Sequence, residues 1–237
     1  PLPVSDQSEP HPLCDAFIAA AEETGHPRND DFNGAAQEGA GYYQTTSRGG
    51  FRVSAAVAYL NPARSRRNLT IATRAHATRV LFDGRTATGI EWHSGGETFR
   101  AYADGELILS AGAINTPHLL QLSGVGGGEL LRSRGVAPLH DIAGVGEHLQ
   151  DHLQVRMVFE CTRPITFNDD MSNPFRTALV GLRYLMQRKG PLTVSAGYAG
   201  GFFRTDRALT SPDIQVHFIN FSTSKMGDAL HRFSGFT

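Results

Sequence analysis

The sequence has little of what marks several large protein classes. It has only 2 cysteines in 237 residues, Cys14 and Cys161, and we expect both to be free thiols in a reducing compartment. A formal net charge of −1, without a long basic block, argues against a nucleic-acid-binding protein. No apolar run reaches membrane-spanning length, and no signal-peptide pattern opens the chain. With 40% hydrophobic residues, the chain can build a core for one large or two small domains.

Short motifs of common enzyme classes are missing as well. The dinucleotide fingerprint G-x-G-x-x-G fails at Gly39-Ala40-Gly41, because the third glycine is absent. No G-x-S-x-G motif occurs, which argues against a serine hydrolase. His148 and His152 stand four residues apart, a spacing that can place two metal ligands on one helical face, although no third ligand is indicated. A metal-dependent enzyme using these histidines, or a non-catalytic interaction module, is the alternative left open.

The most informative stretch is residues 105–126, GELILSAGAINTPHLLQLSGVG. Its apolar run at 107–109 is typical of a strand buried on both faces. Small residues follow, and Asn115, Thr116 and Pro117 can cap and begin a helix. A buried strand, a bend of small residues and a helix start together allow a ligand to approach the backbone closely. The alternative is that the small residues only let the helix pack on the strand.

Hydrophobic periodicity and turn signals predict a mixed α/β chain, in part α+β. Asp83-Gly84 and the Gly95-Gly96 pair predict turns of a β-meander, and a long amphipathic helix begins at Asn173-Pro174. Helices are predicted at 15–24, 53–60, 129–134 and 174–189. Strands are predicted at 69–73, 78–82, 86–93, 97–103, 106–110, 136–140, 155–161, 200–204 and 214–221.

Several stretches, taken together, resemble the glucose-methanol-choline (GMC) oxidoreductases. GAINTPHLLQLSGVG at 112–126 is similar to the second signature of that family. Agreement continues in order at 31–44 (DFNGAAQEGAGYYQ), 51–62 (FRVSAAVAYLNP), 68–84 (NLTIATRAHATRVLFDG) and 144–152 (GVGEHLQDH). The resemblance implies an FAD-dependent enzyme that oxidises an alcohol and passes hydride to flavin N5. It also implies part of an FAD-binding dinucleotide fold with an inserted β-meander, and part of an antiparallel-sheet substrate domain.

The resemblance also implies site residues. The backbone of Ala77 would meet the adenine edge, and Ser110, Ala111 and Gly112 would line the adenosine–diphosphate side of FAD. Tyr43 and Gln44 are candidates for the flavin side. His217, on a predicted substrate-domain strand, is a candidate for the substrate pocket. The family's catalytic histidine is expected beyond Thr237; His26-Pro27 does not match its motif, because Arg28 follows.

The chain is expected to be an internal piece of a longer protein, since it begins with Pro1 and the family's phosphate loop and catalytic histidine are both missing. Residues 1–35 are predicted to connect to the substrate domain, 36–150 to belong to the FAD domain and 151–237 to the substrate domain. The expected partner is a small-molecule alcohol, with the electron acceptor left open and with no nucleic acid and no membrane span. The expected location is the cytoplasm, with peripheral membrane association left open. Choline dehydrogenase-like members are nearest in pattern.

Overall fold

The chain forms two compact units in the computed structural model, which describes residues 2–225 and 227–237. The first unit joins the N-terminal segment, up to Leu69, with Val155–Thr237, and the second unit is Thr70–Gln154. These boundaries differ from the predicted division at residue 35, because the segment after that residue pairs with a strand near residue 200. Which unit carries which part of the chemistry stays a prediction.

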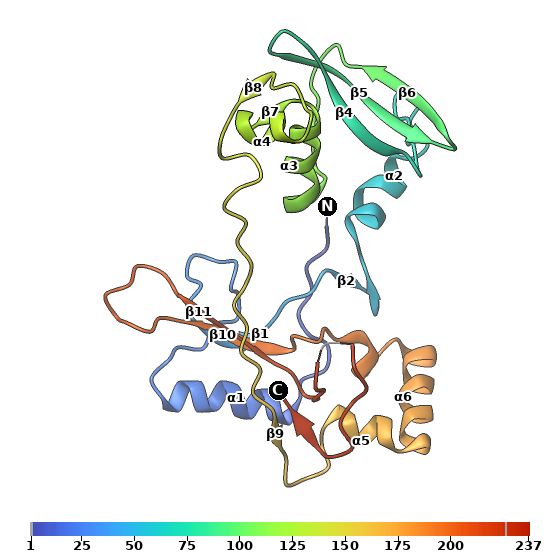
Figure 1. The fold of residues 1–237 in the computed structure, drawn as a ribbon. Coiled ribbons are helices and arrows are strands. Elements are labelled where there is room, and N and C mark those ends of the chain that lie inside the picture. Colours follow the sequence, from blue (N-terminus) through green and yellow to red (C-terminus); the bar gives the residue numbers. More distant parts are fainter. Residues whose placement is uncertain (1, 226) are drawn as a thin grey trace. The chain divides into compact units, whose positions relative to one another are not determined.

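The first unit is built on a three-stranded antiparallel sheet in the order β1-β10-β11 (Figure 1). Its strands are β1 (Gly39–Tyr42), β10 (Ala199–Phe203) and β11 (Ile214–Phe218). Gly41 pairs with Gly200, and Gly200 pairs with His217 on the other side. Small residues dominate β1 and β10 because other backbone segments of the same protein pass close to them. A side chain at Gly41, for example, would overlap the carbonyl oxygen of Asn29.

Helix α1 (Pro12–Glu23) covers this sheet and completes the core. Its buried residues Cys14 and Ile18 pack with Tyr198, Ala199 and Phe218. The helix was predicted at 15–24, and it begins earlier because Pro12 occupies the first turn after an N-cap. Cys14 and Cys161 are free thiols, and burial raises the pKa of Cys14 to about 12, so this thiol is unreactive.

The rest of the first unit consists of short elements around this core. The predicted helix at 53–60 is present, but Pro62 does not end it: proline fits the first turn of α2, which continues the helix. The strand predicted at 155–161 is reduced to β9, because only its last part finds a partner, β12. The elements are β2 (Ser47–Arg48), β3 (Phe51–Arg52), η1 (Ala56–Leu60), α2 (Asn61–Ala63), β9 (Phe159–Glu160), α5 (Phe167–Ser172), η2 (Pro191–Thr193) and β12 (Gly235–Phe236).

Helix α6 (Pro174–Gln187) is the long amphipathic helix that the sequence predicted. Asn173 caps it: its Oδ1 accepts from the N–H groups of Phe175 and Arg176 at 3.0 and 3.3 Å. Arg188, with φ of 53°, ends the helix in a left-handed conformation. No residue of α6 is buried, so the apolar stripe of this helix faces solvent in the described structure.

The second unit holds the predicted meander, β4-β5-β6, with two helices (Figure 1). The strands are β4 (His76–Asp83), β5 (Thr86–Ser94) and β6 (Glu97–Tyr102). Helices α3 (Gly112–Leu122) and α4 (Gly128–Ser133) flank a short parallel pair, β7 (Val125–Gly126) and β8 (His140–Asp141). The N–H of Val80 donates to Ser123 Oγ at 2.8 Å, which joins β4 to the end of α3.

Two predictions around residue 110 are wrong in the described structure. The stretch 103–111 forms no strand, and Ile108 is 78% exposed, because no strand of the described residues lies beside it to share hydrogen bonds. The helix begins at Gly112 instead of after Asn115, and Pro117 lies inside it. The strand predicted at 69–73 is also absent, and the one at 136–140 is reduced to β8.

Candidate functional site

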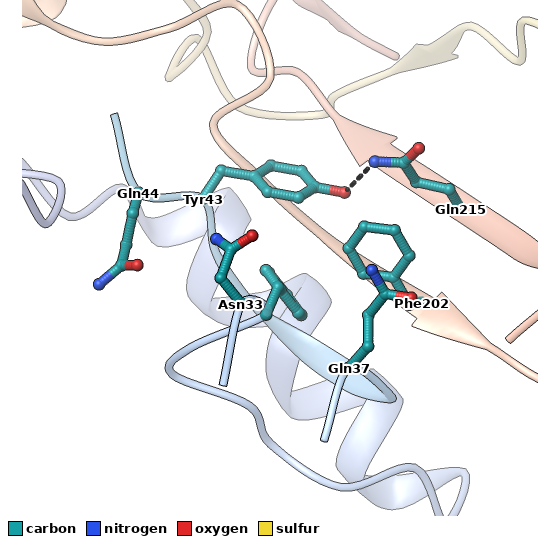
Figure 2. Close-up of a pocket in the computed structure, with 7 residues that line it drawn as sticks. Asn33, Gln37, Tyr43, Gln44, Phe202 and Gln215 are labelled. Carbon is teal, nitrogen blue, oxygen red and sulfur yellow. Dashed lines mark hydrogen bonds between the residues drawn. The ribbon is translucent and has the colours of Figure 1, made fainter. Parts of the chain in front are cut away.

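Tyr43 and His217, far apart in the sequence, form an aromatic pair on the first unit. Their ring centroids are 5.2 Å apart. The hydroxyl of Tyr43 donates to the carbonyl oxygen of Val216 at 2.8 Å and accepts from Gln215 Nε2 at 3.4 Å (Figure 2). Gly200 makes this approach possible, since a side chain there would overlap the Tyr43 ring. The sheet register, which pairs Gly200 with His217, therefore places both rings together.

A cavity of about 230 Å³ lies beside Tyr43. Its aromatic part is Phe32, whose ring centroid lies 5.2 Å from that of Tyr43 and 5.1 Å from that of Phe202. Side-chain amides supply most of its polar groups, as Figure 2 shows, and no charged side chain lines it. Amides both donate and accept, so this lining suits a neutral polar ligand with a flat face. The lining residues are Phe32, Asn33, Gln37, Tyr43, Gln44, Phe202 and Gln215.

Protonation makes Tyr43 a donor and not a base. Burial raises the pKa of Tyr43, and the hydrogen bond from Gln215 offsets this only in part. The hydroxyl therefore stays protonated at neutral pH and keeps donating to Val216. The ring of Tyr43 can hold the ring of His217 in place, but the hydroxyl of Tyr43 does not act as a proton acceptor.

Gln44 also belongs to a second cavity of about 450 Å³. Its Nε2 donates to Asp6 Oδ1 at 2.9 Å. On the same side, the hydroxyl of Tyr42 donates to Asp15 Oδ1 at 2.7 Å, and burial is the main cause of its raised pKa. Gln44 thus forms part of the wall of both cavities. The second is lined by Asp6, Gln7, Pro10, Asp30, Tyr42 and Gln44.

The four residues predicted for the adenosine side lie in the second unit. Ala77 is on β4, an edge strand of the meander, where alternate residues present N–H and C=O groups away from the partner strand. Ser110 and Ala111 are exposed, and Gly112 has φ of 87° with open space around its missing side chain. No side chain caps the start of α3, although Thr116 Oγ1 accepts from the N–H of Ala111 at 3.1 Å. This bend therefore offers open backbone to a ligand.

The structure thus brings Tyr43 and Gln44 to one cavity of the first unit, and His217 contacts the Tyr43 ring without lining that cavity. The other four candidates lie in the second unit. Sequence reasoning missed the other aromatic and amide residues of the smaller cavity. Gln215 could have been found, because it lies two residues before His217 and so shares its face of β11. No comparable position relative to a predicted site residue marked Phe32, Gln37 or Phe202.

The geometry behind the metal alternative is not present. His148 has φ of 59° and lies in a stretch without a helix, so the spacing of four does not put it on one helical face with His152. The backbone N–H of His152 donates to the neighbouring Asp151. Within the part of the chain that the structure describes, no three metal-ligating side chains come together.

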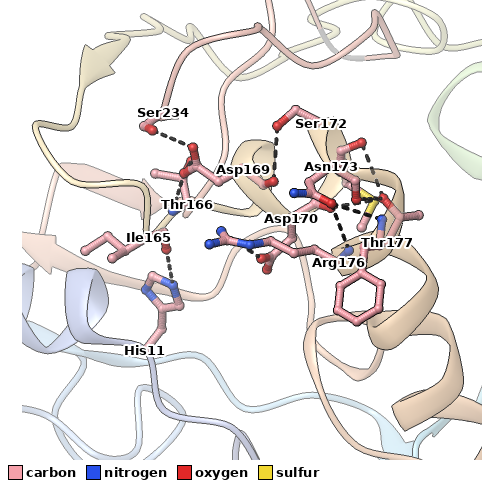
Figure 3. A network of polar contacts seen from close by, with 12 residues as sticks. His11, Ile165, Thr166, Asp169, Asp170, Ser172, Asn173, Arg176, Thr177 and Ser234 are labelled. Atoms are coloured by element: carbon pink, nitrogen blue, oxygen red, sulfur yellow. Dashed lines mark hydrogen bonds and ion pairs between the residues drawn. The ribbon is translucent and has the colours of Figure 1, made fainter.

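A polar network near α5 holds the first unit together (Figure 3). Asp169 accepts from both the N–H and the hydroxyl of Thr166, at 2.9 and 2.7 Å, and from the hydroxyl of Ser234. His11 Nε2 lies 3.0 Å from the carbonyl oxygen of Ile165, and its Nδ1 accepts from the N–H of Leu13. Each polar group in this network has a structural partner, which is why we assign it to stability.

Comparison with known proteins gives the chain a family. The family model described as GMC oxidoreductase matches residues 1–154. The chain is 43% identical over 219 residues to the mitochondrial choline dehydrogenase of Homo sapiens. The aligned residues make up 92% of this chain and 37% of that protein. The chain therefore spans a little over a third of the length of this relative.

Solved structures agree with this match. Pyridoxine 4-oxidase from Mesorbium loti superposes with a TM-score of 0.80 at 27% identity, covering 100% of this chain and 43% of that chain. An FAD-dependent oxidoreductase from Chaetomium thermophilum has a TM-score of 0.75 at 26% identity, covering 85% and 36%. Among the described residues, every helix is too short or too polar to cross a membrane. The predicted resemblance is confirmed, and the chain belongs to the GMC oxidoreductase family.

Proposed function

We propose that this chain is a segment of an FAD-dependent oxidoreductase that oxidises the hydroxyl-bearing carbon of a small alcohol. The observation that carries the proposal is the family match over residues 1–154, together with 43% identity to a choline dehydrogenase. Since the chain covers 37% of that relative, the remaining length would supply the phosphate loop and the catalytic histidine. FAD, when bound, would accept the hydride of the alcohol at N5.

The described residues fit one side of such a cofactor. The open backbone at Ser110, Ala111 and Gly112 would let a nucleotide approach closely, and no bulky side chain covers it. Ala77, on an edge strand of the same unit, would offer backbone groups to the adenine edge. We assign these four residues to FAD binding. The isolated chain is expected to bind FAD poorly, because it lacks the family's phosphate loop and so would make only part of the contacts to the cofactor.

We assign Tyr43 and Gln44 to the flavin side and His217 to the substrate pocket. Two observations support this assignment: Tyr43 and Gln44 line the smaller cavity, and the ring of His217 packs against that of Tyr43. His217 would face the substrate, with the Tyr43 ring fixing its plane. The proposed domains are 36–150 for the cofactor and 151–237 for the substrate, with 1–35 as a connection. The proposed location is the cytoplasm.

The test uses a longer protein that contains this chain together with its flanking sequence, at the length of its relatives. We expect visible flavin absorbance after purification and reduction of an acceptor dye only when an alcohol is added. Choline and a panel of primary alcohols would identify the substrate, and aerobic peroxide formation would separate an oxidase from a dehydrogenase. A protein that purifies without flavin and fails to bind added FAD would overturn the proposal.

A matched pair of variants tests whether the bend at residues 110–112 contacts FAD. Ala111→Phe places a large ring on the exposed bend and should abolish most FAD binding while the protein stays folded. Ala143→Phe, at another exposed position of the same unit, should keep normal FAD content. Equal flavin content in both variants would remove residues 110–112 from the cofactor site and leave the enzyme assignment standing.

A further inference from the structure

The smaller cavity has an aromatic wall, formed by Phe32, Tyr43 and Phe202, in which the rings touch one another. The ring centroid of Phe32 lies 5.2 Å from that of Tyr43 and 5.1 Å from that of Phe202, and the last two are 6.3 Å apart. A cage for an ammonium group needs separated rings whose faces surround the cation. Rings this close together instead form one continuous surface, against which a flat group can pack.

Two side-chain amides of the same cavity are available to a ligand (Figure 2). Gln44 and Gln215 already donate to neighbouring side chains, at 2.9 and 3.4 Å. The side chains of Asn33 and Gln37 form no hydrogen bond within the described residues. Each of these amides carries an NH₂ donor and a carbonyl acceptor, so together they can recognise a group that both accepts and donates.

The loop that carries these two amides is held by its own hydrogen bonds. Asn29 Nδ2 donates to the carbonyl oxygens of Ala36 and Glu38 at 2.8 and 3.2 Å. Asp31 Oδ1 accepts from the N–H of Asn33 at 3.0 Å. Because the loop is fixed before a ligand arrives, less conformational entropy is lost on binding.

Charge and size narrow the kind of ligand. Among the described residues that line this cavity none is charged, so an ammonium or carboxylate group would give up water there without gaining an ion pair. The cavity volume of about 230 Å³ is below the roughly 300 Å³ at which pockets for drug-sized ligands begin. The cavity therefore suits one ring with a small neutral substituent, and not a larger molecule.

We propose that this cavity binds a neutral planar group of the alcohol substrate, of the aromatic carboxamide class. This rests on the proposed function, since it names the substrate class of the same enzyme. The substrate ring packs against the aromatic wall, and its carboxamide forms hydrogen bonds with Asn33 and Gln37. Tyr43 connects the cavity with His217, the candidate residue of the substrate pocket, because its ring contacts both. Choline fits this cavity poorly, because its trimethylammonium group is charged and has no hydrogen-bond donor.

Benzamide tests the cavity without any need for turnover, because it has the planar carboxamide but no alcohol carbon to oxidise. Calorimetric titration of the longer protein that contains this chain should show binding of benzamide, and choline should not displace it. Gln37→Leu removes an amide from an exposed loop position and should weaken benzamide binding about fivefold. Gln187→Leu, the same change at an exposed position of α6, is the matched control and should leave binding unchanged.

A pair of alcohols tests whether the cavity selects the substrate. The first, para-hydroxymethylbenzamide, is neutral; the second, para-aminomethylbenzyl alcohol, has the same ring and hydroxyl group with a cationic substituent. The KM should be at least about tenfold lower for the neutral alcohol. Gln37→Leu should raise this KM about fivefold and leave kcat unchanged, because the cavity holds a part of the substrate remote from the reacting carbon. Benzyl alcohol, which lacks the carboxamide, should show the same KM with both proteins.

The two measurements separate this proposal from the proposed function. A longer protein without flavin or turnover would overturn the oxidoreductase assignment, and the benzamide titration would still decide whether the cavity binds its ligand. Absence of benzamide binding, displacement of benzamide by choline, or equal losses in Gln37→Leu and Gln187→Leu would overturn the binding site. Equal KM values for the neutral and the cationic alcohol would overturn the substrate class.

Discussion

The hydroxyl of Tyr43 donates to the carbonyl oxygen of Val216 at 2.8 Å, and this bond joins the segment after β1 to β11, two strands away in the sheet. The same tyrosine holds its ring against His217. Tyr43→Phe keeps the ring and removes the bond, so it should lower the free energy of unfolding by about 1 kcal/mol. Urea denaturation measures this. Tyr102→Phe, at a ring that is 72% exposed, is the control and should have little effect.

Two glycines should respond to alanine in opposite ways. A side chain at Gly200 would overlap Val216 and Tyr43, so Gly200→Ala should cost about 2 kcal/mol or more of stability. Gly181 lies in α6 with open space around its missing side chain, so Gly181→Ala should stabilise the protein by about 0.5–1 kcal/mol. Thermal unfolding of both variants measures the two effects. Midpoint temperatures that shift by similar amounts in the same direction would contradict the sheet register, which places Gly200 against Val216 and Tyr43.

His11 should make stability depend on pH. Burial lowers the pKa of His11; a hydrogen bond with Ile165 and the charges of Asp15 and Asp170 oppose this only in part. The folded state therefore binds fewer protons than the unfolded state as the pH drops below the ordinary histidine pKa of about 6.5. The stability contributed by His11 is present above this value and is lost as the pH falls through the lowered pKa.

The variant His11→Asn tests this contribution, since asparagine can still cap α1 but does not titrate. Urea denaturation between about pH 7.5 and about pH 5 should show a smaller loss of stability in the variant than in the unmodified protein. An unchanged pH profile would mean that other groups cause the loss.

Asp169 should be needed for the polar network near α5. Burial raises its pKa, but the hydrogen bonds donated by Ser234 and Thr166 outweigh burial and lower the pKa overall. Asp169→Asn keeps the size of the side chain and replaces an acceptor oxygen with an N–H donor, so it should cost about 2 kcal/mol. The comparison variant is Asp228→Asn, at an exposed position. Calorimetry should show a clearly lower midpoint for the first variant only.

Local signals predicted the meander and α6. Asp83-Gly84 and Gly95-Gly96 fix tight turns, and φ values of 57° at Gly84 and 61° at Gly95 show why glycine is needed there. Asn173 and Pro174 before an apolar stripe are a local signal for a helix start, since asparagine caps α6 and proline fits its first turn. These features depend on neighbours within a few residues, so they can be recognised before any fold is known.

Elements that depend on distant partners could not be predicted in this way. Gly39–Tyr42 has little β-propensity and forms a strand only because a second small-residue segment lies beside it. Conversely, the apolar run at 107–109 has the right composition for a strand but finds no partner among the described residues. The candidate cavity has the same origin, since the pairing of β10 with β1 brings Phe202 next to Phe32, which lies in the loop before β1, and no local pattern encodes that pairing.

The pairing of β1 with β10 sets an order of events during synthesis. Residues 39–42 leave the ribosome long before their partners at 199–203, and the entire second unit is made in between. The meander, with its short turns, can form early, whereas the first sheet has to wait for a partner some 160 residues downstream. Truncated chains that stop before residue 199 would therefore leave the glycine-rich edge of β1 without its partner strand. Nascent chains in this state are the ones that we expect chaperones to bind.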